Sequence, residues 1–86
     1  MERGHHLSKR LLCLETYIQL RSNRELYLEN CRRIVEYNDI RIVIQTKDLT
    51  LEIWGSGLEA DSRSPECLVI HGDIQALNLK AKGKNT

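Results

Sequence analysis

Apolar residues occupy every second position in successive short runs between positions 25 and 79, and this alternation constrains the fold more than any other feature. A β-strand points successive side chains to opposite faces, so a period of two is typical of strands that bury one face. Each run ends at a polar or glycine-containing turn. The alternating positions are Leu26 and Leu28, then Ile40, Ile42 and Ile44, then Leu49, Leu51 and Ile53, then Leu68 and Ile70.

The pattern predicts an all-β fold: a single small domain of short, mostly antiparallel strands with glycine bends. Strands are expected at about 12–20, 25–29, 33–37, 40–46, 49–54, 67–71 and 74–79. Apolar parity shifts after Gly55 and after Gly72, as at a bulge or sharp bend. The polar stretch 61–66 is expected to be a loop. A repeated strand–glycine–strand pattern leaves three arrangements open, namely a meander, a roll or a short β-solenoid-like sandwich.

The ends of the chain differ from its centre. Residues 1–10 are expected to form a flexible leader, residues 11–79 the β domain, and residues 80–86, with three lysines, a flexible basic tail. The segment 11–20 fits a strand by its shared parity, but Leu11, Leu14 and Ile18 also fit helical spacing. The run Thr16, Tyr17 and Ile18 favours the strand, and both remain open.

Shared parity within each strand also predicts the core. The residues expected to be buried together are Leu28, Ile42, Ile44, Leu51, Ile53, Leu68 and Ile70. Phe is absent, so this core is aliphatic.

The charge balance excludes some functions. Thirteen basic and twelve acidic residues give a net charge of +1, which is not the basic excess of a strong phosphate-binding surface. The apolar runs are too short to span a bilayer, and no signal-peptide pattern is recognised, so a cytoplasmic location is expected. Three cysteines without CxxC spacing are expected to be reduced thiols.

Candidate chemical groups are isolated from one another. His5 and His6 are adjacent but lack a partner cluster, and His71 is expected on the face away from the core. Cys31 has Arg32 and Arg33 beside it, but neighbouring residues on a strand face opposite ways, so a structural, half-buried cysteine is the preferred interpretation. We therefore expect no catalytic, cofactor-binding or metal-binding residue, no cofactor and no enzymatic activity.

Three aromatic residues are the candidate protein-contact residues: Trp54, Tyr27 and Tyr37. Trp54 lies out of phase with the core positions of its strand, and an exposed tryptophan indicates a protein contact. Arginines interleaved with the tyrosines raise an alternative, a small nucleic-acid-binding β-barrel. Glutamates interspersed with these arginines weaken that alternative.

The order of signals along the chain resembles the YabP/YqfC family of bacterial sporulation proteins, most closely its YqfC branch. The resemblance covers about residues 17–79 and is carried by ELYLENCRRIVEYND, IRIVIQTKDLTLEIWGSGLEA and ECLVIHGDIQALNL. The individual motifs are degenerate, and their order and spacing provide the match.

This resemblance implies an all-β domain expressed in the mother cell of an endospore-forming bacterium. It implies no catalytic residues. The function expected is that of a non-enzymatic sporulation protein, located in the mother-cell cytoplasm, that contacts itself or another sporulation protein.

Overall fold

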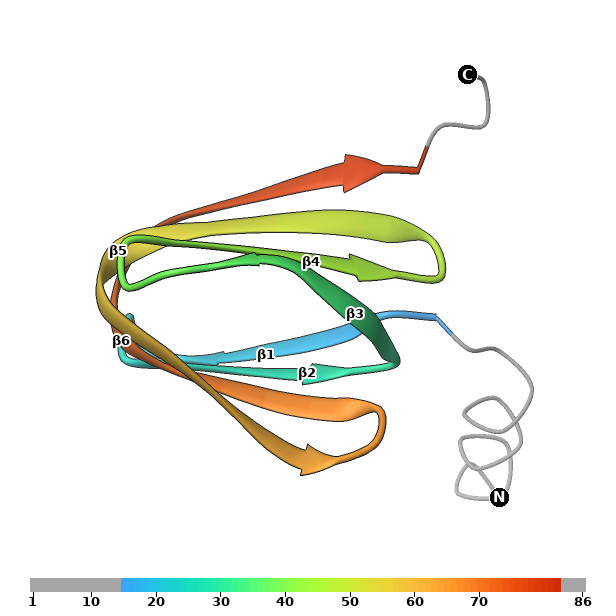
Figure 1. Cartoon of the computed structure of the whole chain (residues 1–86), viewed down its shortest axis with the longest axis horizontal. Coiled ribbons are helices and arrows are strands. Elements are labelled where there is room, and N and C mark those ends of the chain that lie inside the picture. The colour runs from blue at the N-terminus through green and yellow to red at the C-terminus, as the bar shows by residue number, and fades with distance from the viewer. Residues whose placement is uncertain (1–14, 83–86) are drawn as a thin grey trace.

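The computed structural model describes residues 15–82, which form six strands in one antiparallel sheet (Figure 1). The strands are β1 (Tyr17–Arg21), β2 (Glu25–Glu29), β3 (Cys31–Tyr37), β4 (Arg41–Thr46), β5 (Leu49–Ser64) and β6 (Cys67–Ala81). Their order in the sheet is β1-β2-β6-β5-β4-β3. The predicted all-β fold is therefore confirmed. Antiparallel pairing throughout favours a bent meander over a solenoid, whose strands stack in parallel.

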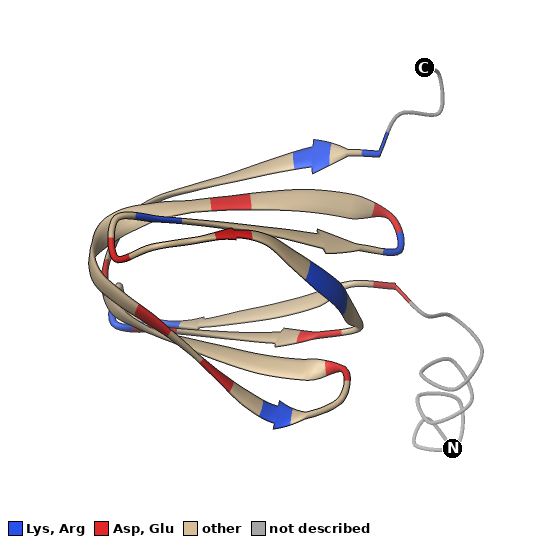
Figure 2. Ribbon diagram, in the orientation of Figure 1, with Lys and Arg blue, Asp and Glu red and all other residues tan. Residues whose placement is uncertain are grey.

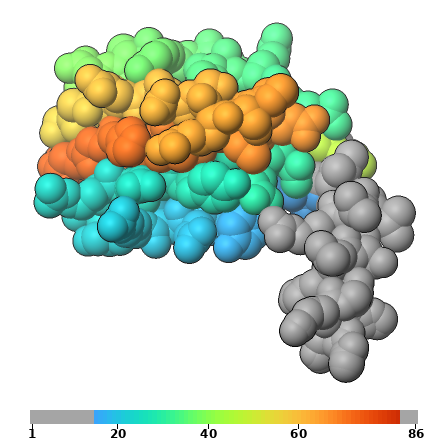
Figure 3. All heavy atoms as spheres, turned by 90° about the horizontal axis from the view of Figure 1, so that it is seen from below, coloured from blue at the N-terminus to red at the C-terminus, as the bar shows by residue number. Residues whose placement is uncertain are grey.

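The sheet folds over on itself because β5 and β6 are long and bend together near their middles (Figure 1). The first half of β5 and the second half of β6 lie with β3 and β4 in what we term the β3–β4 layer. The other halves lie with β1 and β2 in the β1–β2 layer, whose four strands are side by side in Figure 3. One sheet thus provides both layers of a small sandwich.

Glycines make this bend possible. The pairing of β5 with β6 shifts register between Trp54 and Gly55 and again between Ser56 and Glu59. Gly72 has a φ of +137°, and a Cβ there would lie 2.6 Å from the carbonyl oxygen of Gly57. Only glycine fits such a backbone angle and so close an approach. The prediction that Gly55 and Gly72 mark bends is confirmed.

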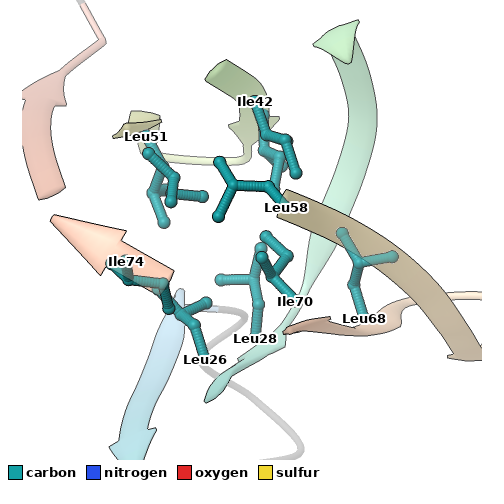
Figure 4. Packing of buried hydrophobic residues seen from close by; sticks show 10 residues of the cluster. Leu26, Leu28, Ile42, Leu51, Leu58, Leu68, Ile70 and Ile74 are labelled. Carbon is teal, nitrogen blue, oxygen red and sulfur yellow. The ribbon is translucent and has the colours of Figure 1, made fainter. Parts of the chain in front are cut away.

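The core lies between the two layers (Figure 4). All seven residues predicted to be buried together belong to it, so that prediction is confirmed. The core is completed by residues from β2, β5 and β6 that the same alternation places inward, namely Leu26, Leu58 and Ile74. Complete burial of a leucine or isoleucine side chain stabilises a fold by roughly 1.5–3 kcal/mol.

Two strands extend further than predicted. The stretch 61–66 was expected to be a loop, but β5 continues to Ser64, with Asp61 opposite Val69 and Ser62 opposite Leu68. Among the described strands this part of β5 pairs with β6 alone, and the side chains of residues 61–64 are exposed, so no apolar alternation marks the strand here. Likewise β6 continues through Gly72 to Ala81, so residues 80 and 81, which were expected in the flexible tail, lie in a strand.

The segment before Ser22 is a strand where the structure describes it. Strand β1 pairs with β2 from Tyr17 to Arg21, and Ile18 packs against the core. The helical alternative is thus wrong for these residues. The expected leader, residues 1–10, and the rest of the predicted strand, residues 12–14, lie outside the described residues.

A buried threonine ties the layers together at the end opposite the bend. Thr46 is fully buried, and its Oγ1 accepts a hydrogen bond from the backbone N–H of Leu49 at 2.9 Å. The hydroxyl of Thr16, just before β1, lies 2.6 Å from Thr46 Oγ1 and 2.6 Å from Asp48 Oδ1. The hydrogen bond from Thr16 lowers the pKa of Asp48. The start of β1 is therefore held on the β4–β5 turn.

Candidate protein-contact site

Trp54 lies on the outer face of the β3–β4 layer, as its parity predicts. It is opposite Arg41 on β4 and Ala76 on β6, and its side chain is 39% exposed. The guanidinium carbon of Arg41 lies 5.0 Å from the centroid of the indole ring. A cation at this distance from a tryptophan face is attracted by the ring quadrupole. The indole therefore has a defined orientation and still presents surface to solvent.

Two carboxylates hold the guanidinium group of Arg41. Its Nη1 donates to Glu36 on β3 and its Nη2 donates to Glu52 on β5. Asn78 on β6 donates from Nδ2 to the other oxygen of Glu52 at 3.1 Å. We call this group, Glu36, Arg41, Glu52, Trp54 and Asn78, the Trp54 face. It spans all four strands of the layer.

The electrostatics of the Trp54 face follow from these contacts. Hydrogen bonds from Arg41 and then Asn78 lower the pKa of Glu52 to about 2, and the bond to Glu52 raises the pKa of Arg41. Arg41 Nε is buried and has no hydrogen-bond partner among the described residues. The arginine is thus charged and already paired, and its positive charge is largely balanced.

Tyr27 lies on the outer face of the other layer. It is half-buried between Gln19 of β1 and Val69 of β6. Its hydroxyl lies 3.6 Å from Cys67 Sγ and 2.9 Å from Glu29 Oε2, and donation to these acceptors raises the pKa of Tyr27 above its ordinary value of 10.0. The ring also meets that of Tyr17 edge to face, with centroids 6.3 Å apart.

Tyr37 lies at the end of the edge strand β3 and is 50% exposed. Its hydroxyl accepts a hydrogen bond from the backbone N–H of Ala60. The structure therefore does not bring the three predicted contact residues together. Trp54 and Tyr27 lie on opposite outer faces, and Tyr37 lies at an edge between the layers.

Sequence reasoning missed the partners of Trp54. The turn Lys47–Asp48 already implies that Arg41 stands opposite Trp54, because hairpin positions pair symmetrically about the turn. Counting outward from this turn places Arg41 opposite Trp54 and Val43 opposite Glu52. Glu52 is therefore the diagonal neighbour of Arg41 on the same face of the hairpin. The contributions of Glu36 and Asn78 depend on β3 and β6, whose register is set by bulges and bends.

The candidate chemical groups stay apart in the described part of the chain. His71 is half-buried on the outer face between Glu25 and Glu59. Cys31 packs against the core, and burial raises the pKa of its thiol. Within residues 15–82 there is no group of three histidine, cysteine or acidic residues placed to hold a metal ion. His5, His6 and Cys13 lie outside the described residues.

The charged residues of this sheet do not form a field of one sign. Figure 2 shows lysine and arginine interspersed with aspartate and glutamate on the strands of both layers. Arg21 is paired with Glu25 at 3.3 Å and Arg41 with two glutamates. Such pairing weakens attraction to a phosphate backbone, which depends on cations that are free to replace counterions.

Comparison with known proteins identifies the family. The YabP family model matches residues 14–86, most of the chain. The chain belongs to the YabP family. No curated protein and no solved structure matches it. The bent six-stranded sheet and the Trp54 face are thus features of a YabP family member. Residues 15–82 contain no helix that is long and apolar enough to cross a membrane.

Proposed function

We propose that this YabP family chain is a non-enzymatic sporulation protein that acts through protein–protein contacts, in the mother-cell cytoplasm of an endospore-forming bacterium. The observation that carries the proposal is the Trp54 face. It presents an oriented, partly exposed tryptophan beside a half-buried, ion-paired arginine on an outer face that no described element covers. Tryptophan and arginine dominate the binding energy of protein interfaces. The order of motifs supports placement in the YqfC branch.

The ion pairs of the Trp54 face favour a protein partner. Because Glu36 and Glu52 fix Arg41, the surface is rigid before binding, and a rigid surface loses less entropy when a partner docks. The same glutamates oppose the nucleic-acid alternative, since they place negative charge beside the aromatic ring. A partner is expected to cover the indole and to meet the polar groups around it.

Site-specific photo-crosslinking in sporulating cells tests this proposal. A photoreactive phenylalanine at position 54 should form covalent adducts with one protein, and Trp54→Ala should abolish its co-purification with the tagged chain. The matched control carries the photoreactive residue at Glu59, an exposed position on the other layer. Adducts that are identical from both positions, or co-purification that survives Trp54→Ala, would contradict the Trp54 face as the contact.

Two further measurements separate the alternatives. A fluorescent fusion should report the compartment, with signal confined to the mother cell. Anisotropy of a labelled single-stranded oligonucleotide tests nucleic-acid binding. Affinity that falls linearly with salt on logarithmic axes would instead support the β-barrel alternative.

A further inference from the structure

Strand β1 is an open edge of the β1–β2 layer. Among the strands that the structure describes, it pairs with β2 alone, and its register is regular across all five residues. An unpaired, regular edge presents backbone N–H and C=O groups to which another strand can bond. Its side chains are also accessible, with Tyr17 48% exposed and Leu20 50% exposed.

The other open edges carry features that discourage pairing. Strand β3 has two register irregularities and bears Arg32 and Arg33. The free part of β5 is irregular near Ser62 and ends before Pro65. The free part of β6 carries Lys80 next to its last residue, Ala81, and lysine on an edge strand is a usual protection against pairing. From Tyr17 to Leu20, β1 has no charge, no proline and no bulge.

The sequence of β1 is complementary to itself. When two copies run antiparallel with Gln19 opposite Gln19, Tyr17 stands opposite the partner's Arg21, and Ile18 stands opposite the partner's Leu20. Strand parity puts the tyrosine–arginine pairs on the outer face and the isoleucine–leucine pairs on the inner face. Both pairs are favourable, one as a cation–π contact and one as apolar burial.

The groups that would meet are already in position. The ring of Tyr17 rests against Tyr27, 6.3 Å between centroids, and the guanidinium of Arg21 is held by Glu25. The Arg21 side chain is 80% exposed, so a partner's ring can reach it. A net charge of only +1 offers little repulsion between copies.

We propose that this protein forms a two-fold symmetric dimer by antiparallel pairing of β1 with β1 of a second copy, with the axis at Gln19. One sheet then runs through both molecules. The interface is separate from the Trp54 face, which lies on the other layer and stays free in both copies. It shares with the proposed function only the premise that the chain acts through protein contacts.

Sedimentation equilibrium of the full chain tests the dimer. The wild type should move from monomer to dimer as concentration rises, since an interface of one short strand is small. Leu20→Lys should shift the midpoint at least tenfold upward in concentration. Its matched control is Leu79→Lys, an equally exposed leucine, 52%, near the free edge of β6, which should leave the midpoint unchanged. Thermal melts establish that both variants fold.

Disulfide trapping tests the register independently. Directly opposed residues of antiparallel strands have Cβ atoms about 5 Å apart, so Gln19→Cys should give a covalent dimer on mild oxidation with copper phenanthroline. The wild type, with the same native cysteines, controls for those thiols, and Asn78→Cys controls for pairing through β6. Either a wild type that stays monomeric at every concentration, or trapping by Asn78→Cys in place of Gln19→Cys, overturns the proposal. Trp54→Ala should leave the dimer intact, so loss of a cellular partner and loss of the dimer are separate results.

Discussion

The hydroxyl of Tyr37 accepts a hydrogen bond from the backbone N–H of Ala60 across 2.9 Å. Tyr37 ends β3 in one layer, and Ala60 lies in the half of β5 that belongs to the other layer. Strand β4 pairs with β5 only as far as Trp54, so the Ala60 edge has no neighbouring strand among the described residues. A side chain thus supplies the acceptor that a strand would otherwise provide, and it links the two layers at their open side.

Tyr37→Phe should lower the free energy of unfolding by about 0.5–1.5 kcal/mol, because the ring remains and only the hydrogen bond is lost. Urea denaturation measures this change, with Tyr17→Phe as the matched control. Amide hydrogen exchange gives a second readout, since the Ala60 amide should exchange faster in the variant. Unchanged protection at Ala60 would contradict the role assigned to this hydroxyl.

Ile53→Ala should destabilise the fold by about 2–5 kcal/mol, because the Ile53 side chain is fully buried in the core. Ile40→Ala removes the same atoms from a side chain that is 53% exposed and should cost no more than about 0.5 kcal/mol. Chemical denaturation of both variants checks the difference. Equal costs for the two substitutions would be inconsistent with the core described here.

The two glycines of positive φ should respond differently to alanine. At Gly72 a Cβ would collide with the backbone of Gly57, whereas at Gly57, with a φ of +61°, no atom lies within 4 Å of a Cβ. Gly57→Ala should therefore cost only the left-handed backbone strain, on the order of 1–2 kcal/mol. Gly72→Ala should cost more than this and should lower the melting temperature further. The reverse order of melting temperatures would argue against the bend geometry.

Stability should fall in acid partly through Glu52. Its pKa is lowered from an ordinary 4.5 to about 2, so its carboxylate binds protons less readily in the folded chain than in the unfolded one. This contribution is present above pH 4.5 and is lost as the pH falls toward 2. Glu52→Gln should therefore reduce the slope of unfolding free energy against pH between these values. Glu59→Gln, on the other layer, serves as control, and an identical slope in Glu52→Gln and wild type would refute the assignment.

Alternation predicted the elements well because most strands bury one face. The inward set from Leu28 to Ile70 and the bends at Gly55 and Gly72 could be derived from parity and backbone chemistry alone. The end of β5 could not be derived in this way. Residues 61–64 keep strand geometry through pairing with β6, but their sequence has no alternation of apolar residues that would indicate a strand.

The candidate site was only partly predictable. The outward position of Trp54 follows from the phase of its strand, and Arg41 follows from the hairpin. The hydrogen bond that Tyr37 accepts from Ala60 of its own chain could not be foreseen, since it depends on how the two layers meet. Three separate locations for Trp54, Tyr27 and Tyr37 likewise result from the fold-over, which no local pattern encodes.

The strand order has a consequence for the sequence of folding events. Strands β3, β4, β5 and β6 pair consecutively and can zip up through local turns, and β1 and β2 form a hairpin of their own. Strand pairing joins the two units only through β2 and β6, whose nearest paired residues are Glu29 and Cys67. Closing so long a loop is slow compared with forming a hairpin. The β1–β2 hairpin should consequently dock last on refolding and detach first on unfolding, leaving the β3–β6 meander as the intermediate.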